Sequence, residues 1–144
     1  MASAFAATRP TGTPFAGRDS TAYQPGVCNI GPAEVARRRR AGHVGSLAAV
    51  ILLAVLVALG APPPVRLLVG LPAAGAASGY LQAWLRFCSG FGSRGVFNFG
   101  QLGQTQQVQD PDARARDRAK AYQIGLASVG IGLAIGVVAV LLPL

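Results

Sequence analysis

The sequence predicts an all-α integral membrane protein with three transmembrane helices, a cytoplasmic N-terminus and a disordered N-terminal tail. The chain of 144 residues is 51% hydrophobic and only 12% charged, about half of the ~25% typical of soluble domains, yet its net charge is +8. Apolar spans flanked by arginines explain both facts. A soluble nucleic-acid-binding protein would explain only the charge, so we expect no nucleic-acid partner.

Three mostly apolar runs approach or exceed the length of about 20 residues that crosses a bilayer core of roughly 30 Å. The first, at about 44–61, ends before three consecutive prolines at 62–64, which forbid further helix. The second, at about 65–85, is rich in small residues, and Pro72 is expected to kink it. The third, at about 121–142, closes the sequence.

The polar segments divide the chain into three parts. Residues 1–26, rich in Ala, Ser, Thr, Pro and Gly, are expected to form the disordered cytoplasmic tail, although an organelle transit peptide has a similar composition. Residues 27–100 form the membrane hairpin, with a basic leader and a Gly/Phe loop. Residues 101–144 form a basic helix that begins with Asp110 as its cap and runs into the third span.

The leader is expected to form a short helix that starts at Pro32, with Glu34 in its first turn, and reaches the first span through a hinge at Gly42. The Gly/Phe loop that begins at Phe87 is expected to lie in the membrane interface with its phenylalanine rings inserted.

Lys and Arg flank the spans very unevenly. Six precede the first span, six lie between the second and third, and only Arg66 falls on the opposite side. Because positive residues stay in the cytoplasm, we expect the N-terminus and the long loop to lie there. Basic side chains near the surface also attract anionic lipid head groups. The residues assigned to this topogenic or lipid-facing role are Arg37, Arg38, Arg39, Arg40, Arg114, Arg116, Arg118 and Lys120.

Small residues at helical spacing predict close packing between membrane helices. Gly75 and Gly79 are four residues apart in the second span. Ser128, Gly132 and Gly136 follow one another at the same spacing in the third span and share one face. The stripe is expected to pack within the chain or against a partner protein.

The two cysteines are the residues with obvious reactive potential. Cys28 precedes a predicted helix start and four arginines, both of which lower the pKa of a thiol, and Cys88 follows the second span. They are interpreted either as two unreactive residues, as a cytosolic redox pair or as part of a metal site. His43 is the only histidine, which leaves a closed zinc site one ligand short, so no metal is expected.

A match to G-x-G-x-x-G at residues 90–95 follows a predicted membrane span. The same letters bind dinucleotides only between a strand and a helix. No cofactor is therefore expected.

Residues 28 to about 100 resemble a small bacterial inner-membrane hairpin family of unknown function, which is sometimes fused to rhodanese sulfurtransferase domains. The matching features are Asn29, the arginines at 37–40, the turn at 62–64 and Cys88. The sequence departs from the family by adding Cys28 and a third span. The resemblance implies a link to cytoplasmic sulfur chemistry.

Together these features predict a multi-pass protein of a bacterial inner membrane; the twelve Arg against one Lys are typical of a GC-rich bacterial genome. The expected role is a non-catalytic accessory or packing subunit that contacts other membrane proteins or itself. The alternative is a membrane-anchored thiol redox or sulfur-handling protein that uses Cys28 and Cys88. A third hypothesis, an oligomeric small-solute carrier, is disfavoured because no ionisable residue lies inside a span.

Overall fold

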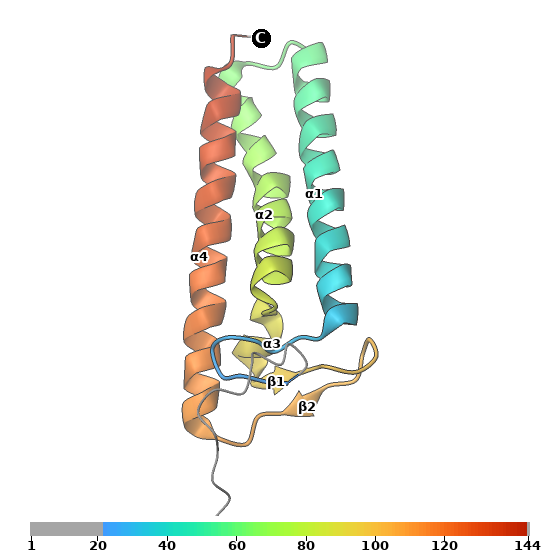
Figure 1. Cartoon of the computed structure of the whole chain (residues 1–144). Coiled ribbons are helices and arrows are strands. Elements are labelled where there is room, and N and C mark those ends of the chain that lie inside the picture. Colours follow the sequence, from blue (N-terminus) through green and yellow to red (C-terminus); the bar gives the residue numbers. More distant parts are fainter. Residues whose placement is uncertain (1–21, 144) are drawn as a thin grey trace, which may run out of the picture.

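The structure is a computed structural model that describes residues 22–143 of the chain. Its main body is a layer of helices: α1 (Pro32–Ala58), α2 (Gly70–Leu85), which continues a 3₁₀ helix η1 (Pro63–Val69), and α4 (Pro111–Leu141). The middle of the layer is α2, which contacts both α1 and α4 (Figure 1). The described chain is therefore mainly helical, as the sequence predicts.

One end of this layer is closed by a smaller part that we call the cap. The cap consists of residues 22–31, the short helix α3 (Ser89–Arg94) and a hairpin of two strands, β1 (Val96–Phe97) and β2 (Gln106–Gln107). The strands pair antiparallel, so that the first residue of β1 lies opposite the last residue of β2. Segments from the start and the middle of the sequence thus lie together beneath the helices (Figure 1).

Helix α1 is continuous over 27 residues, from the leader predicted at Pro32 to the end of the first span. The sequence suggested a hinge at Gly42, but this glycine is buried inside the helix. A Cβ atom on Gly42 would lie 2.8 Å from the ring of Tyr80, and one on Gly79 would lie 2.5 Å from the Gly42 nitrogen. The missing side chains allow α1 and α2 to approach closely, so Gly42 serves packing rather than bending.

The second apolar run forms two helix types in succession. It is a 3₁₀ helix up to Val69 and an α-helix from Gly70, two residues before the expected kink at Pro72. A proline lacks the N–H that would continue the α-helical bonding toward the preceding turn. Two helices, α1 and α4, are each long and apolar enough to cross a membrane, whereas α2 alone has 16 residues.

Helix α4 begins as predicted and runs unbroken for 31 residues. The Asp110 side chain caps it by accepting a hydrogen bond of 3.0 Å from the Asp112 N–H, and Pro111 occupies the first helical position. The polar helix predicted at the surface therefore continues directly into the third apolar run.

The cap contains parts of two segments that the sequence analysis did not expect to fold together: the end of the N-terminal tail and the loop after α2. Residues 1–21 of the expected disordered tail lie outside the described residues, but its last residues enter a hydrogen-bonded turn that spans Gln24 to Cys28. The loop after α2 was expected to insert phenylalanine rings into the membrane interface. Instead, Phe87 is fully buried, and Phe97 stacks on Tyr23 with ring centroids 4.7 Å apart. Phe87 packs against Ala121 and Ile124 of α4, whereas Phe97 packs within the cap.

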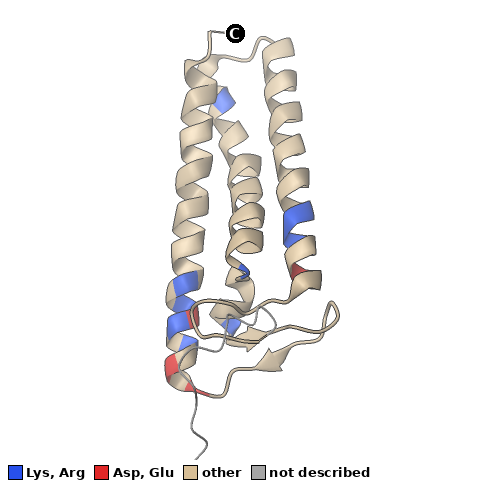
Figure 2. Cartoon of the chain, in the orientation of Figure 1, with Lys and Arg blue, Asp and Glu red and all other residues tan. Residues whose placement is uncertain are grey.

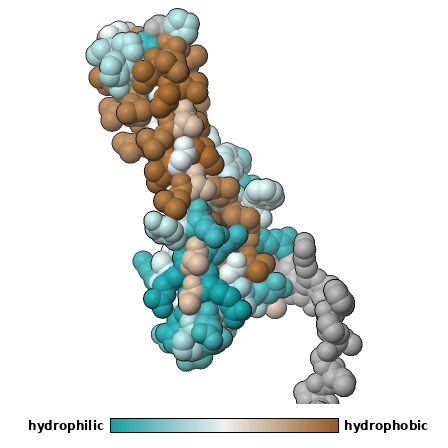
Figure 3. Space-filling view, turned by 90° about the vertical axis from the view of Figure 1, so that its left-hand side faces the viewer, coloured by the Kyte–Doolittle hydropathy of each residue, from teal (hydrophilic) through white to brown (hydrophobic). Residues whose placement is uncertain are grey.

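Charged and apolar side chains separate along the length of the molecule. Most charged residues gather at the cap end (Figure 2). Arg66, in η1, lies near the opposite end, where it donates to the Leu142 carbonyl at 3.1 Å. Brown, apolar atoms cover the part of the layer away from the cap (Figure 3). Large apolar side chains such as Leu47, Leu71 and Leu133 are exposed there. This distribution suits a layer surrounded by hydrocarbon with a cap in water.

Candidate functional site

The Cys88 thiol lies in a buried polar cluster where α1 and α2 meet the cap. Cys88 follows α2, acts as the N-cap residue of α3 and is 1% exposed. Arg38, one and a half turns into α1, donates a hydrogen bond of 2.8 Å from Nη2 to the Cys88 sulfur. The Arg38 guanidinium also lies 6.0 Å from the centre of the Phe91 ring. The thiol is thus held between a cation and the first turn of α3.

Asn29 fixes the backbone of Cys88 from the other side. The Asn29 side chain donates to the Cys88 carbonyl at 3.0 Å and accepts from the Cys88 N–H at 2.7 Å. The backbone N–H groups of Asn29 and Ile30 both donate to the Arg86 carbonyl, at 3.1 and 3.3 Å. Asn29 is itself fully buried. These bonds join the segment before α1 to the junction of α2 and α3.

Glu34 and Asn98 complete the set that we call the Cys88 cluster, together with Asn29, Arg38 and Cys88. Glu34 is 1% exposed, and its carboxylate lies 3.9 Å from the Arg38 guanidinium. Asn98 donates to Glu34 at 3.5 Å and to the Gln101 carbonyl at 2.9 Å. Arg38 therefore lies between the Glu34 carboxylate and the Cys88 sulfur. Arg38 is half-buried and Glu34 is fully buried, so removal of the arginine would leave the Glu34 carboxylate buried without this ion pair, which destabilises the folded state.

Cys28 has different surroundings from those the sequence suggested. A helix start and nearby arginines were expected to lower its pKa. In the structure, burial raises the pKa of the Cys28 thiol, and this effect outweighs the hydrogen bond to Ile30 and the charge of Arg86, which both lower it. Its sulfur lies 3.8 Å from the Ile30 carbonyl oxygen. The expected lowering is therefore wrong, because removal of water disfavours the thiolate more than these partners stabilise it.

The two cysteines do not form a disulfide in the structure, and each is a free, buried thiol. Cys88 contacts Arg38, whereas Cys28 contacts a backbone carbonyl. The described residues contain no group of three His, Cys, Asp or Glu side chains placed to hold a metal ion. The chemistry that this arrangement offers is that of one thiol beside one guanidinium.

The basic residues assigned to the membrane surface have several positions. Arg38 points inward to Cys88, which corrects its expected lipid-facing role, and Arg37 lies 3.6 Å from the Glu34 carboxylate. Arg114 donates to the Gln109 carbonyl at 3.2 Å. Arg39 is exposed in a shallow pocket. The remaining side chains are exposed or half-buried on the outside of α1 and α4: Arg40, Arg116, Arg118 and Lys120.

The small residues of α4 contact the middle helix. A Cβ atom on Gly132 would lie 2.6 Å from both the Gly70 carbonyl oxygen and the Ala74 Cβ, and one on Gly136 would lie 2.9 Å from the Leu67 oxygen. Buried Ser128 donates to the Ile124 carbonyl at 2.7 Å within the helix. The stripe thus lies against η1 and α2.

The pair predicted in α2 divides between two surfaces. Gly79 is buried against α1, where a Cβ atom on it would lie 2.8 Å from the Arg38 carbonyl oxygen. Gly75 is exposed, and a Cβ atom there would meet no atom within 4 Å. Gly75 therefore does not face a helix of the described chain, so of the two kinds of packing expected for the small residues only contact with a partner protein is open to it. Four residues are slightly more than one helical turn, so the two positions need not share a neighbour.

A further polar contact, which the sequence did not predict, holds the cap to α4. The fully buried Asp117 accepts 2.7 Å hydrogen bonds from the Tyr23 hydroxyl and the Gly26 N–H. Burial and the negative charge of Asp117 raise the pKa of Tyr23. An acidic residue among basic neighbours on α4 was the available sequence signal, but its partners lie more than 90 positions away.

Asn29 and Asn98 were the other residues whose roles the sequence left unassigned. Asn29 entered only through the family resemblance, and Asn98 entered no prediction. Each of these amides lies in the sequence between apolar residues, and a buried amide needs hydrogen-bond partners.

No protein family, curated protein or solved structure matches the chain.

Proposed function

We propose that this chain is a three-span membrane protein of a bacterial inner membrane, with its N-terminus and cap in the cytoplasm. The basic residues near the cap support this orientation, because ten of the eleven Lys and Arg residues that the structure describes lie in the cap or in the adjoining ends of α1, α2 and α4. The second span in this proposal, between α1 and α4, consists of η1 followed by α2. With rises of about 2.0 and 1.5 Å per residue, the two extend over roughly 35–40 Å, more than a hydrocarbon core of ~30 Å.

Its proposed role is that of a non-catalytic subunit that packs against a helix of another membrane protein in a larger assembly. The supporting observation is a groove on one face of the layer, with a volume of about 330 Å³. Small residues let helix backbones approach closely in membranes. The groove residues are Ser46, Ala49 and Val50 from α1, Ala73, Ala76, Ala77 and Tyr80 from α2, and Ile131 and Ile135 from α4.

This groove takes over the partner-binding role suggested for the stripe of α4. Because Gly132 and Gly136 contact η1 and α2, they are occupied within the chain. The groove, in contrast, has open volume between all three long helices. A partner helix in it would gain van der Waals contacts along α2 without displacing any helix of this chain.

The proposal is tested by filling the groove with one large side chain. Ala77→Trp is expected to remove a stoichiometric partner that co-purifies with the tagged protein in mild detergent. Ala48→Trp is the matched control, since Ala48 is exposed on α1 and does not line the groove. A wild-type protein that elutes without a partner, or equal loss of the partner in both variants, would refute the subunit role.

A second candidate function, thiol chemistry at Cys88, is supported by the 2.8 Å contact with Arg38. A cation bonded to sulfur is typical of the surroundings of reactive thiols. Burial raises the pKa of the Cys28 thiol, whereas Cys88 has the Arg38 contact, so Cys88 is the proposed reacting residue in place of the pair. The link to sulfur chemistry that the family resemblance implied involves this same residue.

Alkylation of the folded protein tests this second function. In a Cys28→Ser variant, Cys88 should react with iodoacetamide faster than Cys28 reacts in a Cys88→Ser variant. The Arg38→Lys change keeps the charge but loses the planar guanidinium, and it should slow the reaction of Cys88. If Cys88 reacts only after unfolding, the cluster has a structural role and the thiol function is excluded.

A further inference from the structure

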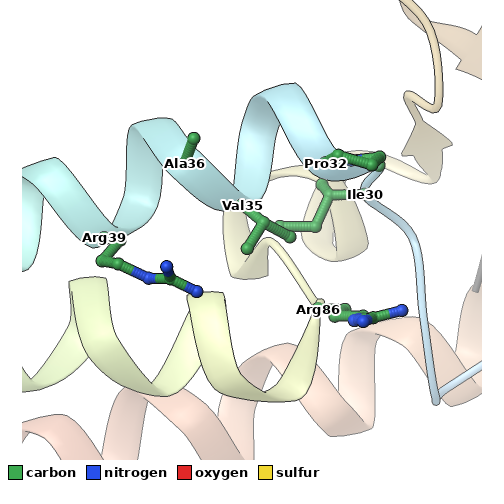
Figure 4. Close-up of a pocket in the computed structure, with 7 residues that line it drawn as sticks. Ile30, Pro32, Val35, Ala36, Arg39 and Arg86 are labelled. Carbon is green, nitrogen blue, oxygen red and sulfur yellow. The ribbon is translucent and has the colours of Figure 1, made fainter.

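A small pocket outside the Cys88 cluster lies where the first turns of α1 meet the end of α2 (Figure 4). Its volume is about 250 Å³. Arg39 from α1 and Arg86 from the end of α2 lie on its two sides, with Val35 and Ile30 between them (Figure 4). The residues that line it are Ile30, Gly31, Pro32, Val35, Ala36, Arg39 and Arg86.

The positive charge of this pocket is not neutralised by the part of the chain that the structure describes. Arg39 and Arg86 are exposed, and neither side chain has an ion pair or hydrogen bond to a described residue. The acid in this part of α1, Glu34, pairs with Arg37 and Arg38 instead. Two guanidinium groups from different helices are therefore available to one ligand.

The backbone at Arg86 is strained beside this pocket. Arg86 has φ 52° and ψ 36° and is the one residue other than glycine with positive φ between residues 22 and 143. Helices commonly end with glycine or asparagine in this conformation, because a larger side chain is strained there. The Asn29 and Ile30 N–H groups bind the Arg86 carbonyl and hold the strained conformation. Strain retained in this way is common at binding sites.

We infer that this pocket binds the phosphate head group of an anionic phospholipid in the leaflet next to the cap. Guanidinium groups form paired hydrogen bonds with phosphate oxygens. Two arginines supply twice the positive charge of one and can donate to the phosphate from two sides. The apolar wall formed by Ile30, Pro32 and Val35 suits the glycerol and the first methylenes of a lipid. The pocket is lined by the first turns of α1 next to the cap, and beyond the cap end the ribbon carries few charged residues (Figure 2), as expected at the level of lipid phosphates.

The test measures lipid binding to the full-length protein in detergent by native mass spectrometry. Phosphatidylglycerol should bind more tightly than phosphatidylcholine. The Arg39→Gln/Arg86→Gln variant should lose about tenfold or more in affinity for phosphatidylglycerol, because it removes the charged hydrogen-bond donors that hold the phosphate oxygens. The matched control is Arg40→Gln/Arg94→Gln, which removes the same charge from exposed positions outside the pocket and should change affinity less than twofold.

Two further measurements separate lipid binding from the binding of free phosphate and from a change in stability. Inorganic phosphate at millimolar concentration should leave lipid binding unchanged; full displacement would mean that the site binds free phosphate. Arg86→Gly relieves the strained backbone while removing the guanidinium, so it should keep or raise the thermal midpoint and still weaken lipid binding. Unchanged affinity in Arg86→Gly, or an equal loss in both double variants, would overturn the proposal.

Discussion

Between α2 and α4, contact depends on missing side chains: Gly132 and Gly136 let the backbone of α4 reach Gly70 and Leu67. In the cap, contact depends on side chains with polar atoms, such as Asn29, which bonds both backbone groups of Cys88. The first kind of contact tolerates many apolar neighbours but no added volume. The second requires particular donors and acceptors at fixed distances.

The difference follows from the solvent that each region displaces. Lipid provides no hydrophobic drive for two apolar helices to associate, so the helices gain mainly from close packing. The cap is small, and its buried backbone groups would be unsatisfied without side-chain partners. Packing density therefore specifies the layer, whereas complete hydrogen bonding specifies the cap.

The largest expected effect is in the cap, from Asn29→Ala. This change leaves the buried N–H and C=O of Cys88 without partners, and each such group costs about 1–3 kcal/mol. We expect the free energy of unfolding in detergent to fall by about 2–4 kcal/mol. Gln123→Ala, at an exposed position of α4, is the control and should change it by less than about 0.5 kcal/mol. Similar effects of the two changes would show that the cap does not depend on this clamp.

The next effect concerns the layer, where Gly132→Ala adds one methyl group. That methyl would lie 2.6 Å from the Gly70 oxygen, which belongs to backbone and cannot rotate away. We expect a loss of about 1–3 kcal/mol, as for other overpacked contacts. Gly130→Ala makes the same change two residues away, where a Cβ meets no atom within 4 Å. Thermal denaturation of both variants in one detergent measures the difference, and equal midpoints would contradict the packing role of the stripe.

A smaller effect is expected where the cap meets α4. Asp117→Asn removes the charge that strengthens the hydrogen bonds from Tyr23 and Gly26, for an expected loss of about 1–2 kcal/mol. Asp112→Asn in the exposed first turn removes only a favourable interaction with the helix dipole, of about 0.3–1 kcal/mol. Limited proteolysis near residue 22 should accelerate in the first variant alone. Equal cleavage rates would mean that Asp117 does not retain the segment.

The smallest effect is a pH dependence of the same contact. Because the pKa of Tyr23 is raised in the folded protein, the unfolded chain loses this proton first, at its usual pKa of about 10. The stabilisation is therefore complete below pH 10 and decreases as the pH rises further. The stability difference between the wild type and Tyr23→Phe should shrink from pH 8 to pH 11 in chemical denaturation. A difference that stays constant over this range would exclude the Tyr23 proton as its source.

Local signals allowed part of the fold to be predicted. Pro32 and Glu34 indicate the start of α1, and Asp110 with Pro111 indicates the start of α4, because caps and dipole effects act within one turn. The apolar runs predict long helices by length alone. The cap was missed because its hydrogen bonds join residues such as Asn29 and Cys88, 59 positions apart, and neither residue reveals its partner.

The sequence by itself determined the apolar helices, the start residues of α1 and α4 and the concentration of charge around one end, since these depend on composition and on neighbours within a few residues. Only the tertiary structure decided which side chain of a face meets which partner. It turned Arg38 toward Cys88 while leaving Arg39 exposed, and it buried Gly79 while leaving Gly75 open. Helical periodicity places residues on a common face but does not say which neighbouring segment covers that face. That choice depends on the packing of all three long helices and the cap together.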